Sequence, residues 1–89
     1  VRGFNELLWL QRVCAITVAI VRARSRASAE LRDRMLAHAG SHFAEASPTD
    51  KVHGIGLGAR DRPQVFHPNE WKGANVLGWA YMTVAQELE

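Results

Sequence analysis

The sequence predicts a mainly α-helical domain in which a glycine-rich loop precedes the last helix. Apolar residues recur at helical spacing near the start of the 89-residue chain, again after residue 28, and once more near its end. Between the second and third of these segments lie three glycines at alternate positions, followed by a polar stretch that holds two prolines. Glycine and proline interrupt regular structure, so this part of the chain is expected to form loops. A chain of this length makes one domain or a part of one.

The first helix is expected over residues 6–22. Asn5 is suited to cap it, because its side-chain oxygen can accept a hydrogen bond from a free N–H group of the first turn, and Glu6 lies near the positive end of the helix dipole. The most apolar part, Val13 to Val21, is far too short to cross a bilayer, so it is interpreted as a buried helix. Its expected inward face is Leu7, Leu8, Leu10, Val13, Cys14, Ile16, Thr17 and Ile20.

Two further helices follow. The second is expected over residues 29–39, between a serine cap at Ser28 and a stop at Gly40, with an inward stripe of Leu31, Met35, Leu36 and Ala39. Residues 42–46 are expected to be extended, residues 47–50 to form a turn, and residues 59–71 to form a surface loop. The last helix is expected to start at Asn75 and to bury an amphipathic face of Val76, Leu77, Ala80, Tyr81, Val84 and Leu88.

The residue types exclude several kinds of site. Cys14 is the only cysteine, so the chain forms no internal disulfide and no cysteine-based zinc site. His38 and His42 are four residues apart, but Gly40 is expected to end the helix between them, and no third ligand is near. The glycine segment lacks the directly following helix that a dinucleotide-binding loop requires. No serine elbow and no P-loop is present, and we expect neither a metal nor a cofactor.

Nine of the eleven basic residues are arginines, and five of them lie between residues 22 and 34. Two interpretations stay open for this cluster: a solvated helix end with its linker, or a group that binds a phosphate through paired hydrogen bonds. The arginines are not interleaved with aromatic residues, and no nucleic-acid recognition motif is visible. A small basic helical domain that binds nucleic acid is therefore the least favoured interpretation of the chain.

Carboxylates and tryptophans occur on both sides of the glycine segment, namely Glu45, Asp50, Trp9, Trp71 and Trp79. Cleavage of a bond between ribose and a base leaves positive charge on the sugar, which a carboxylate can stabilise or for which it can activate water. An indole ring can stack on the base. The same residues also fit core tryptophans and an aspartate that supports a turn, so spacing alone leaves both interpretations open.

Three segments, in this order, resemble motifs of the NADAR (YbiA-like) family. Residues 45–50 (EASPTD) resemble its glutamate and Ser-Pro-x-Asp turn, residues 54–57 (GIGL) resemble its WGIGL segment, and residues 71–78 (WKGANVLG) resemble the start of its closing helix. The resemblance covers the chain from Trp9 onward. It implies a YbiA-like multihelical fold over residues 1–89 and a hydrolase that cleaves N-glycosidic bonds in ribosides without a cofactor.

The resemblance also implies substrates and site residues. The substrates would be phosphoribosyl-aminopyrimidine intermediates of riboflavin synthesis or ADP-ribosylated nucleobases. These partners would be small molecules in the cytoplasm, away from membranes, and nucleic acid would enter only as a modified substrate. Asp50 and Trp9 would be the catalytic residues. Gly54, Gly56 and Asn75 are expected to bind the substrate.

Three departures from the family pattern lead to an alternative. The family's upstream EHYFQAQK-like helix, which carries a glutamate, has no counterpart here. His53 replaces the aromatic residue before the first glycine, and Ala85 replaces the arginine that usually ends the last motif. Since the sequence also begins with Val1 rather than methionine, the domain is expected to be incomplete at its N-terminus. The alternative function is an inactive or truncated module that binds ADP-ribose or a nucleotide without cleaving it.

Overall fold

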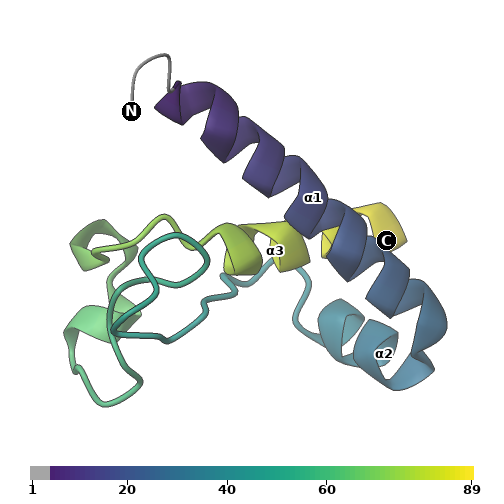
Figure 1. Ribbon diagram of the computed structural model, residues 1–89. Coiled ribbons are helices and arrows are strands. Elements are labelled where there is room, and N and C mark those ends of the chain that lie inside the picture. The colour runs from purple at the N-terminus through teal and green to yellow at the C-terminus, as the bar shows by residue number, and fades with distance from the viewer. Residues whose placement is uncertain (1–4) are drawn as a thin grey trace.

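The computed structural model describes residues 5–89, which form three α-helices and two short 3-10 turns. In chain order these are α1 (Glu6–Ala27), α2 (Ala29–Ala37), η1 (Gln64–Phe66), η2 (Pro68–Glu70) and α3 (Val76–Leu88). The predicted mainly α-helical fold is confirmed, and the described residues form no strand. Figure 1 shows α1 crossing over α3, with α2 at one end of the molecule and the loops at the other.

Helix α1 is longer than the sequence predicted. It continues to Ala27 instead of ending near residue 22, because residues 23–27 contain no glycine or proline and consist largely of good helix formers. The hydroxyl of Ser25 donates to the carbonyl of Arg22 at 2.8 Å, so this buried polar side chain is satisfied within the helix. The guanidinium of Arg32 donates to the carbonyl of Ser25, also at 2.8 Å, and so satisfies an acceptor near the helix end.

Both predicted serine and asparagine caps are present. The side chain of Asn5 accepts from the N–H of Leu8 at 3.0 Å, and that of Ser28 accepts from the N–H of Leu31 at 3.2 Å. Helix α2 ends at Ala37, two residues before the predicted end, and Gly40 follows with a positive φ of 87°.

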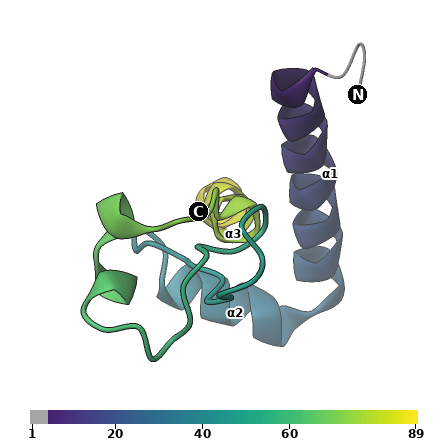
Figure 2. The same ribbon diagram turned by 60° about the vertical axis from the view of Figure 1, so that its left-hand side comes forward.

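The core lies where α1, α2 and α3 meet. Its buried members are Val18, Val21, Met35, Ala80, Val84 and Ala85. A bidentate ion pair between Arg22 and Glu87, with N–O distances of 2.6 and 2.9 Å, joins α1 to α3 beside this core. Figure 2 shows that only part of α1 runs beside α3.

The predicted inward faces of α1 and α2 are wrong at several positions. Large apolar side chains that were expected inside are exposed, namely Leu7, Leu8, Ile16, Ile20 and Leu36. The reason is geometric: α1 packs on α3 through a narrow row that includes Thr17, Val18 and Val21, and its first turns extend past the other helices (Figures 1 and 2). In α2, Met35 is buried as expected.

The loop before α3 closes the start of that helix. Three carbonyls of the loop accept N–H groups at this point. The carbonyl of Gly54 accepts from residue 75 at 2.9 Å, that of Val52 from residue 76 at 2.9 Å, and that of His53 from residue 77 at 3.1 Å. The first N–H groups of a helix have no partner inside it, and a side-chain cap usually supplies one. In this protein backbone carbonyls take that place for the first two N–H groups of α3, those of Val76 and Leu77.

The residue before α3, Asn75, holds the extended segment against the helix. Its side chain is 5% exposed; Oδ1 accepts from the N–H of Glu45 at 3.0 Å, and Nδ2 donates to the carbonyl of Phe43 at 2.8 Å. Its φ of 51° lies in the left-handed region that asparagine tolerates better than most residues. This conformation directs the chain from the loop into α3.

The predicted surface loop is confirmed, with more internal order than expected. Its residues are mostly exposed, yet they form η1 and η2, and the indole N–H of Trp71 donates to the carbonyl of Val65 at 3.1 Å. The guanidinium of Arg62 lies 5.3 Å from the centre of the Phe66 ring, a cation–π distance. Among the described residues, no helix has the length and apolarity that a membrane span requires.

Candidate functional site

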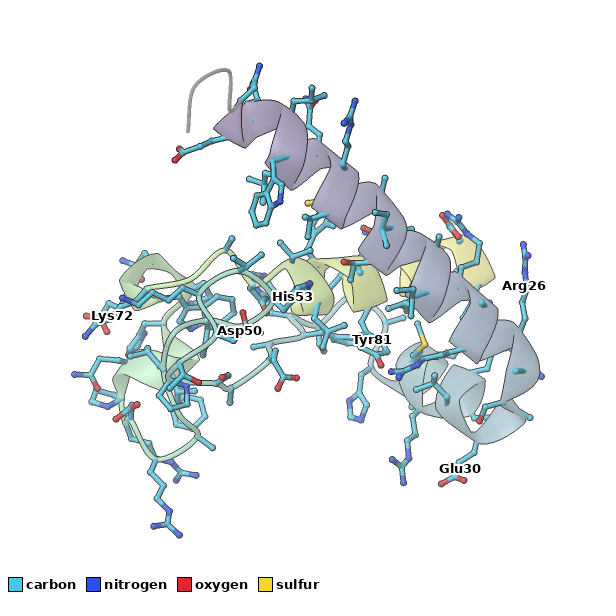
Figure 3. All side chains as sticks on the ribbon, in the orientation of Figure 1. Arg26, Glu30, Asp50, His53, Lys72 and Tyr81 are labelled. Carbon is cyan, nitrogen blue, oxygen red and sulfur yellow. The ribbon has the colours of Figure 1, made fainter. Side chains whose placement is uncertain are left out.

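Asp50 lies at the start of the glycine segment and organises its first turn. Its Oδ1 accepts from the N–H groups of Val52 and His53 at 3.0 and 2.8 Å, and its carbonyl accepts from the N–H of Gly54 at 3.2 Å. Its Oδ2 lies 3.6 Å from Nδ1 of His53. In Figure 3 the Asp50 and His53 side chains lie close together on this loop. One carboxylate oxygen therefore supports the backbone, while the other faces an imidazole.

The environment keeps Asp50 ionised. Its pKa is lowered, first because the carboxylate accepts the N–H of His53, then through the N–H of Val52 and the charge that His53 carries when protonated; desolvation opposes the shift. The side chain is 42% exposed, so water reaches it. An ionised, partly exposed carboxylate is suited to stabilise a cation or to accept a proton from water, and it is unsuited to donate one.

This lowered pKa predicts a specific loss of stability in acid. A carboxylate whose pKa is lower in the folded state stabilises the fold at every pH above its unfolded-state pKa, which is near 3.9. This stabilisation is lost as the pH falls through the folded-state pKa. We therefore expect wild type to exceed Asp50→Asn in thermal midpoint at pH 7 and the difference to shrink below about pH 4. Thermal unfolding followed by circular dichroism at pH 7, 5 and 3 checks this.

Glu87 provides the control, since its pKa is also lowered, by its hydrogen bonds and ion pair with Arg22. In a Glu87→Gln background the change in thermal midpoint caused by Asp50→Asn should keep the same pH dependence. A change that stays constant from pH 7 to pH 3 would contradict the assigned ionisation.

The two glycines expected to bind substrate are buried against the chain itself. A Cβ on Gly54 would come within 2.7 Å of the Asp50 carbonyl oxygen and 3.0 Å of the Glu45 carbonyl oxygen. Gly56 has a φ of 73°, and a Cβ there would lie 2.9 Å from the Cβ of Lys72. The structure thus accounts for both glycines by close packing, which permits the turn that presents Asp50. A role for them in binding substrate stays a prediction, as it does for Asn75.

Trp9, the other expected catalytic residue, lies in the second turn of α1. The residue is 44% exposed, so solvent reaches part of it. It comes from a different part of the fold than Asp50, since α1 packs on α3 and Asp50 lies in the loop that precedes α3. Whether substrate brings Trp9 and Asp50 into one site stays a prediction.

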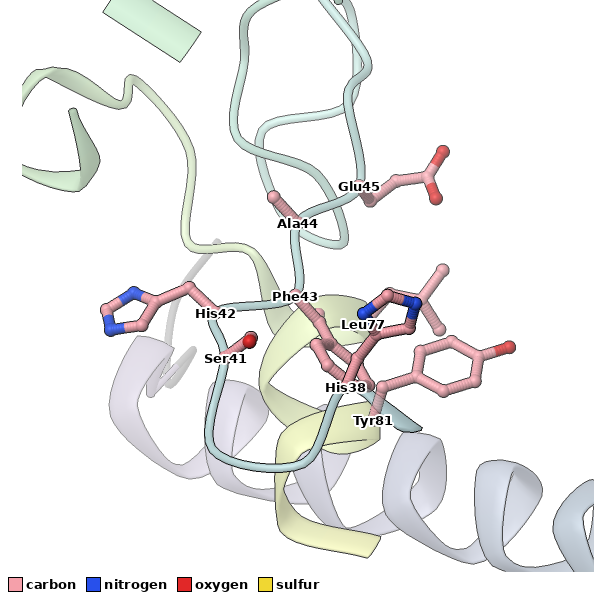
Figure 4. A pocket seen from close by; sticks show the side chains of 9 residues that line it. His38, Ser41, His42, Phe43, Ala44, Glu45, Leu77 and Tyr81 are labelled. Carbon is pink, nitrogen blue, oxygen red and sulfur yellow. The ribbon is translucent and has the colours of Figure 1, made fainter. Parts of the chain in front are cut away.

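The structure also shows cavities that sequence reasoning missed. One of about 380 Å³ lies between α3 and the extended segment after α2, with Phe43, Leu77 and Tyr81 in its wall, and neither Asp50 nor Trp9 lines it. Figure 4 shows the Tyr81 ring beside His38, with Glu45 above. A second, of about 410 Å³, lies beside the surface loop and is lined partly by Phe66 and Trp71.

The remaining carboxylate and tryptophans of the predicted constellation are dispersed. Glu45 is exposed at the edge of the first cavity, Trp71 lies in the wall of the second, and Trp79 is exposed on α3. In Figure 4 His42 points away from His38, so these two side chains do not converge. Within residues 5–89, no three histidine, cysteine or carboxylate side chains come together as a metal site would require.

The comparisons with known proteins give one family model and two relatives. The family model described as NADAR domain matches residues 1–89. The chain is 33% identical over 87 residues to N-glycosidase R617 of Acanthamoeba polyphaga mimivirus, which is 98% of this chain and 51% of that protein. It is 43% identical over 49 residues to Protein irg-1 of Caenorhabditis elegans, which is 55% of this chain and 23% of that protein. The chain thus spans about half the length of the mimivirus relative. No solved structure matches.

Proposed function

Since the chain belongs to the NADAR domain family, we propose that it hydrolyses the N-glycosidic bond of a riboside. The observation that carries this proposal is the similarity, along nearly the whole chain, to a protein named as an N-glycosidase. The ionised Asp50, held on a buried glycine turn and still reached by water, supplies a chemical group of the kind such a reaction needs.

The proposed reaction breaks the bond between C1′ of the ribose and the nitrogen of the base. As that bond breaks, its electron pair leaves with the nitrogen and positive charge develops on the ribose. The negative charge of Asp50 stabilises this state, or Asp50 accepts a proton from the water whose oxygen bonds to C1′. The departing nitrogen takes up a proton, and the products are a free base and a ribose with a hydroxyl at C1′.

The Oδ2 of Asp50 is the oxygen we assign to this chemistry. Its Oδ1 already accepts two backbone N–H groups, which fixes the orientation of the carboxylate without neutralising it. His53, 3.6 Å from Oδ2, is placed to accept or return a proton beside it. The exposed indole of Trp9 is the group that we propose to stack against the base.

We propose two substrate classes: phosphoribosyl-aminopyrimidine intermediates of riboflavin synthesis, and ADP-ribosylated nucleobases. Both carry phosphate, and several arginines of α1 are exposed to solvent, whereas Arg22 is paired with Glu87. The first two N–H groups of α3 are not assigned to the phosphate, because loop carbonyls already accept them.

The test is to incubate the 89-residue chain with a phosphoribosyl-aminopyrimidine and, separately, with ADP-ribosylated guanine, and to separate the products by liquid chromatography. The proposal expects release of the free base from one of the two, with saturation as substrate concentration rises. Saturable binding without any release would instead identify a binding module for ADP-ribose or a nucleotide. Absence of both binding and release contradicts the proposal for this chain.

A further inference from the structure

The proposed reaction uses a proton that Asp50 is unsuited to supply. When the bond to C1′ breaks, its electron pair stays on the departing nitrogen, and a nitrogen that receives a proton leaves more readily. Asp50 is kept ionised, first by the N–H of His53 and also by that of Val52, so it has no proton to donate. A positioned acid beside the carboxylate would speed this step.

The imidazole of His53 lies beside the oxygen of Asp50 that we assign to the reaction. Its Nδ1 is 3.6 Å from Oδ2, and Figure 3 shows the two side chains close together on the loop. Opposite charges at this separation attract, so an ionised carboxylate and a protonated imidazole can be present together. The two nitrogens of an imidazole point in different directions, so Nε2 is directed away from Asp50 when Nδ1 faces it.

The backbone of His53 is held on both sides of its side chain. Its N–H donates to Oδ1 of Asp50 at 2.8 Å, and its carbonyl accepts the N–H of Leu77 at 3.1 Å. The side chain is 44% exposed, so solvent reaches it. A fixed backbone and a partly exposed ring suit a group that exchanges protons with both a bound molecule and water.

The other ionisable groups around this turn are less suited to be the acid. The first turn of α3, residues 76–79, holds no ionisable side chain. Carboxylates are ordinarily ionised at neutral pH, and ammonium and guanidinium groups release their protons only at much higher pH, whereas histidine titrates between about pH 5 and 8. The charged residues of the adjoining segments and of the first half of α1 are all exposed, namely Glu45, Lys51, Lys72, Glu6 and Arg12.

We propose, as an inference that rests on the proposed function, that His53 is the general acid, whose protonated imidazole donates its Nε2 proton to the nitrogen that leaves C1′. The electron pair of the C1′–N bond forms the new N–H bond, and the oxygen of water bonds to C1′. The proton that this water loses passes to Asp50 and then to solvent, while the neutral imidazole takes a proton from solvent. Both side chains are partly exposed, so no further reactant is needed to restore the starting state.

The experiment compares wild type with His53→Asn on two kinds of leaving group. Asparagine places an amide nitrogen near the position of Nδ1, so the contact with Asp50 can persist, but it has no Nε2 and does not titrate. On the N-riboside that wild type cleaves, the variant should be slower by about a hundredfold or more. On para-nitrophenyl riboside phosphate, whose nitrophenolate leaves without a proton, the two proteins should differ by less than about threefold.

The pH dependence of kcat/KM gives an independent readout. With the N-riboside, wild-type kcat/KM should fall as the pH rises through about 6–8, where histidines lose their proton, and also as the pH falls through the lowered pKa of Asp50. In His53→Asn the fall on the alkaline side should be absent. If wild type does not cleave the nitrophenyl riboside, this profile decides alone.

His67→Asn is the matched control. This histidine lies on the exposed loop, and its side chain makes no capping hydrogen bond at the start of η2, so the rate and the pH profile should stay those of wild type. The thermal midpoint of His53→Asn should lie close to that of wild type, because the backbone hydrogen bonds of His53 do not use its side chain. If the variant nevertheless unfolds, His53→Gln replaces it in the same measurements.

The outcomes separate this inference from the proposed function. Equal slowing on both leaving groups, an unchanged rate on the N-riboside, or an alkaline fall that His53→Asn retains would overturn the role of His53 while base release by wild type still stands. If wild type releases no base from any N-riboside, the proposed function fails, and the assignment of His53 fails with it.

Discussion

In Asp50→Asn, release of the base is expected to slow by at least about a hundredfold, with only a modest fall in thermal midpoint. Asparagine keeps an Oδ1 that can accept the N–H groups of Val52 and His53, so the turn retains its support. It removes the negative charge that the proposed reaction uses. Single-turnover kinetics with saturating substrate measure the chemical step directly.

Asp61→Asn is the control for Asp50→Asn. The Oδ2 of Asp61 accepts the N–H of Gly58 at 2.7 Å, so this carboxylate also supports a turn, on the exposed loop. Its replacement should change stability slightly and turnover not at all. Asp50→Ala should lose both turnover and part of the stability, because it removes the charge and the acceptor together. An Asp50→Asn protein that turns over at about half the wild-type rate or more would show that the charge plays no part.

The largest effect on stability is expected at Gly78, inside α3. A Cβ there would overlap the carbonyl oxygen of Phe43 and the side-chain amide of Asn75. That carbonyl is itself held by a hydrogen bond from Asn75, so it cannot withdraw without breaking the contact that attaches the extended segment to α3. Overpacking of this kind costs about 1–3 kcal/mol or more, and loss of the buried hydrogen bonds adds to it.

Helix propensity predicts the opposite sign for Gly78→Ala, because alanine is favoured over glycine inside a helix by about 1 kcal/mol. We expect the steric cost to exceed this gain and the net loss to be about 2 kcal/mol, which for a chain of this size lowers the thermal midpoint by roughly 8–16 °C. Gly58→Ala is the matched control, since the nearest atom to a Cβ there lies 3.5 Å away and its φ is not positive. If Gly78→Ala were more stable than wild type, the extended segment would have to shift away from α3 without a loss of stability.

The helices could be predicted from the sequence because local signals determine them. Asn5 and Ser28 are capping residues with free N–H groups two or three positions onward, and the structure forms both caps. The C-terminal limit of α1 was missed because Arg24 to Ser28 resembles a polar linker in composition. These residues nevertheless contain no glycine or proline and favour a helix, and the guanidinium of Arg32, seven residues after Ser25, satisfies the Ser25 carbonyl near the helix end.

The candidate site could be predicted only as a set of residue types. Asp50 follows a serine and a proline, which indicates a turn, but its hydrogen bonds to Val52 and His53 depend on how the glycines pack on Glu45 and Lys72. Asn75 was expected to bind substrate, and its position in sequence gives no sign that its side chain joins residues 43 and 45, which lie far earlier in the chain. Contacts between segments far apart in sequence carry no local pattern.

The backbone carbonyls that complete the first turn of α3 make the loop and the helix a single cooperative unit. If α3 frays at its N-terminus, the carbonyls of residues 52–54 lose their partners, and the turn that begins at Asp50 loosens with them. Conversely, each core contact of Val76, Ala80 and Val84 that stabilises α3 also restrains the loop. The carboxylate proposed for catalysis thus takes its rigidity from a helix on which it does not lie, and substitutions far from it in the core can shift its orientation.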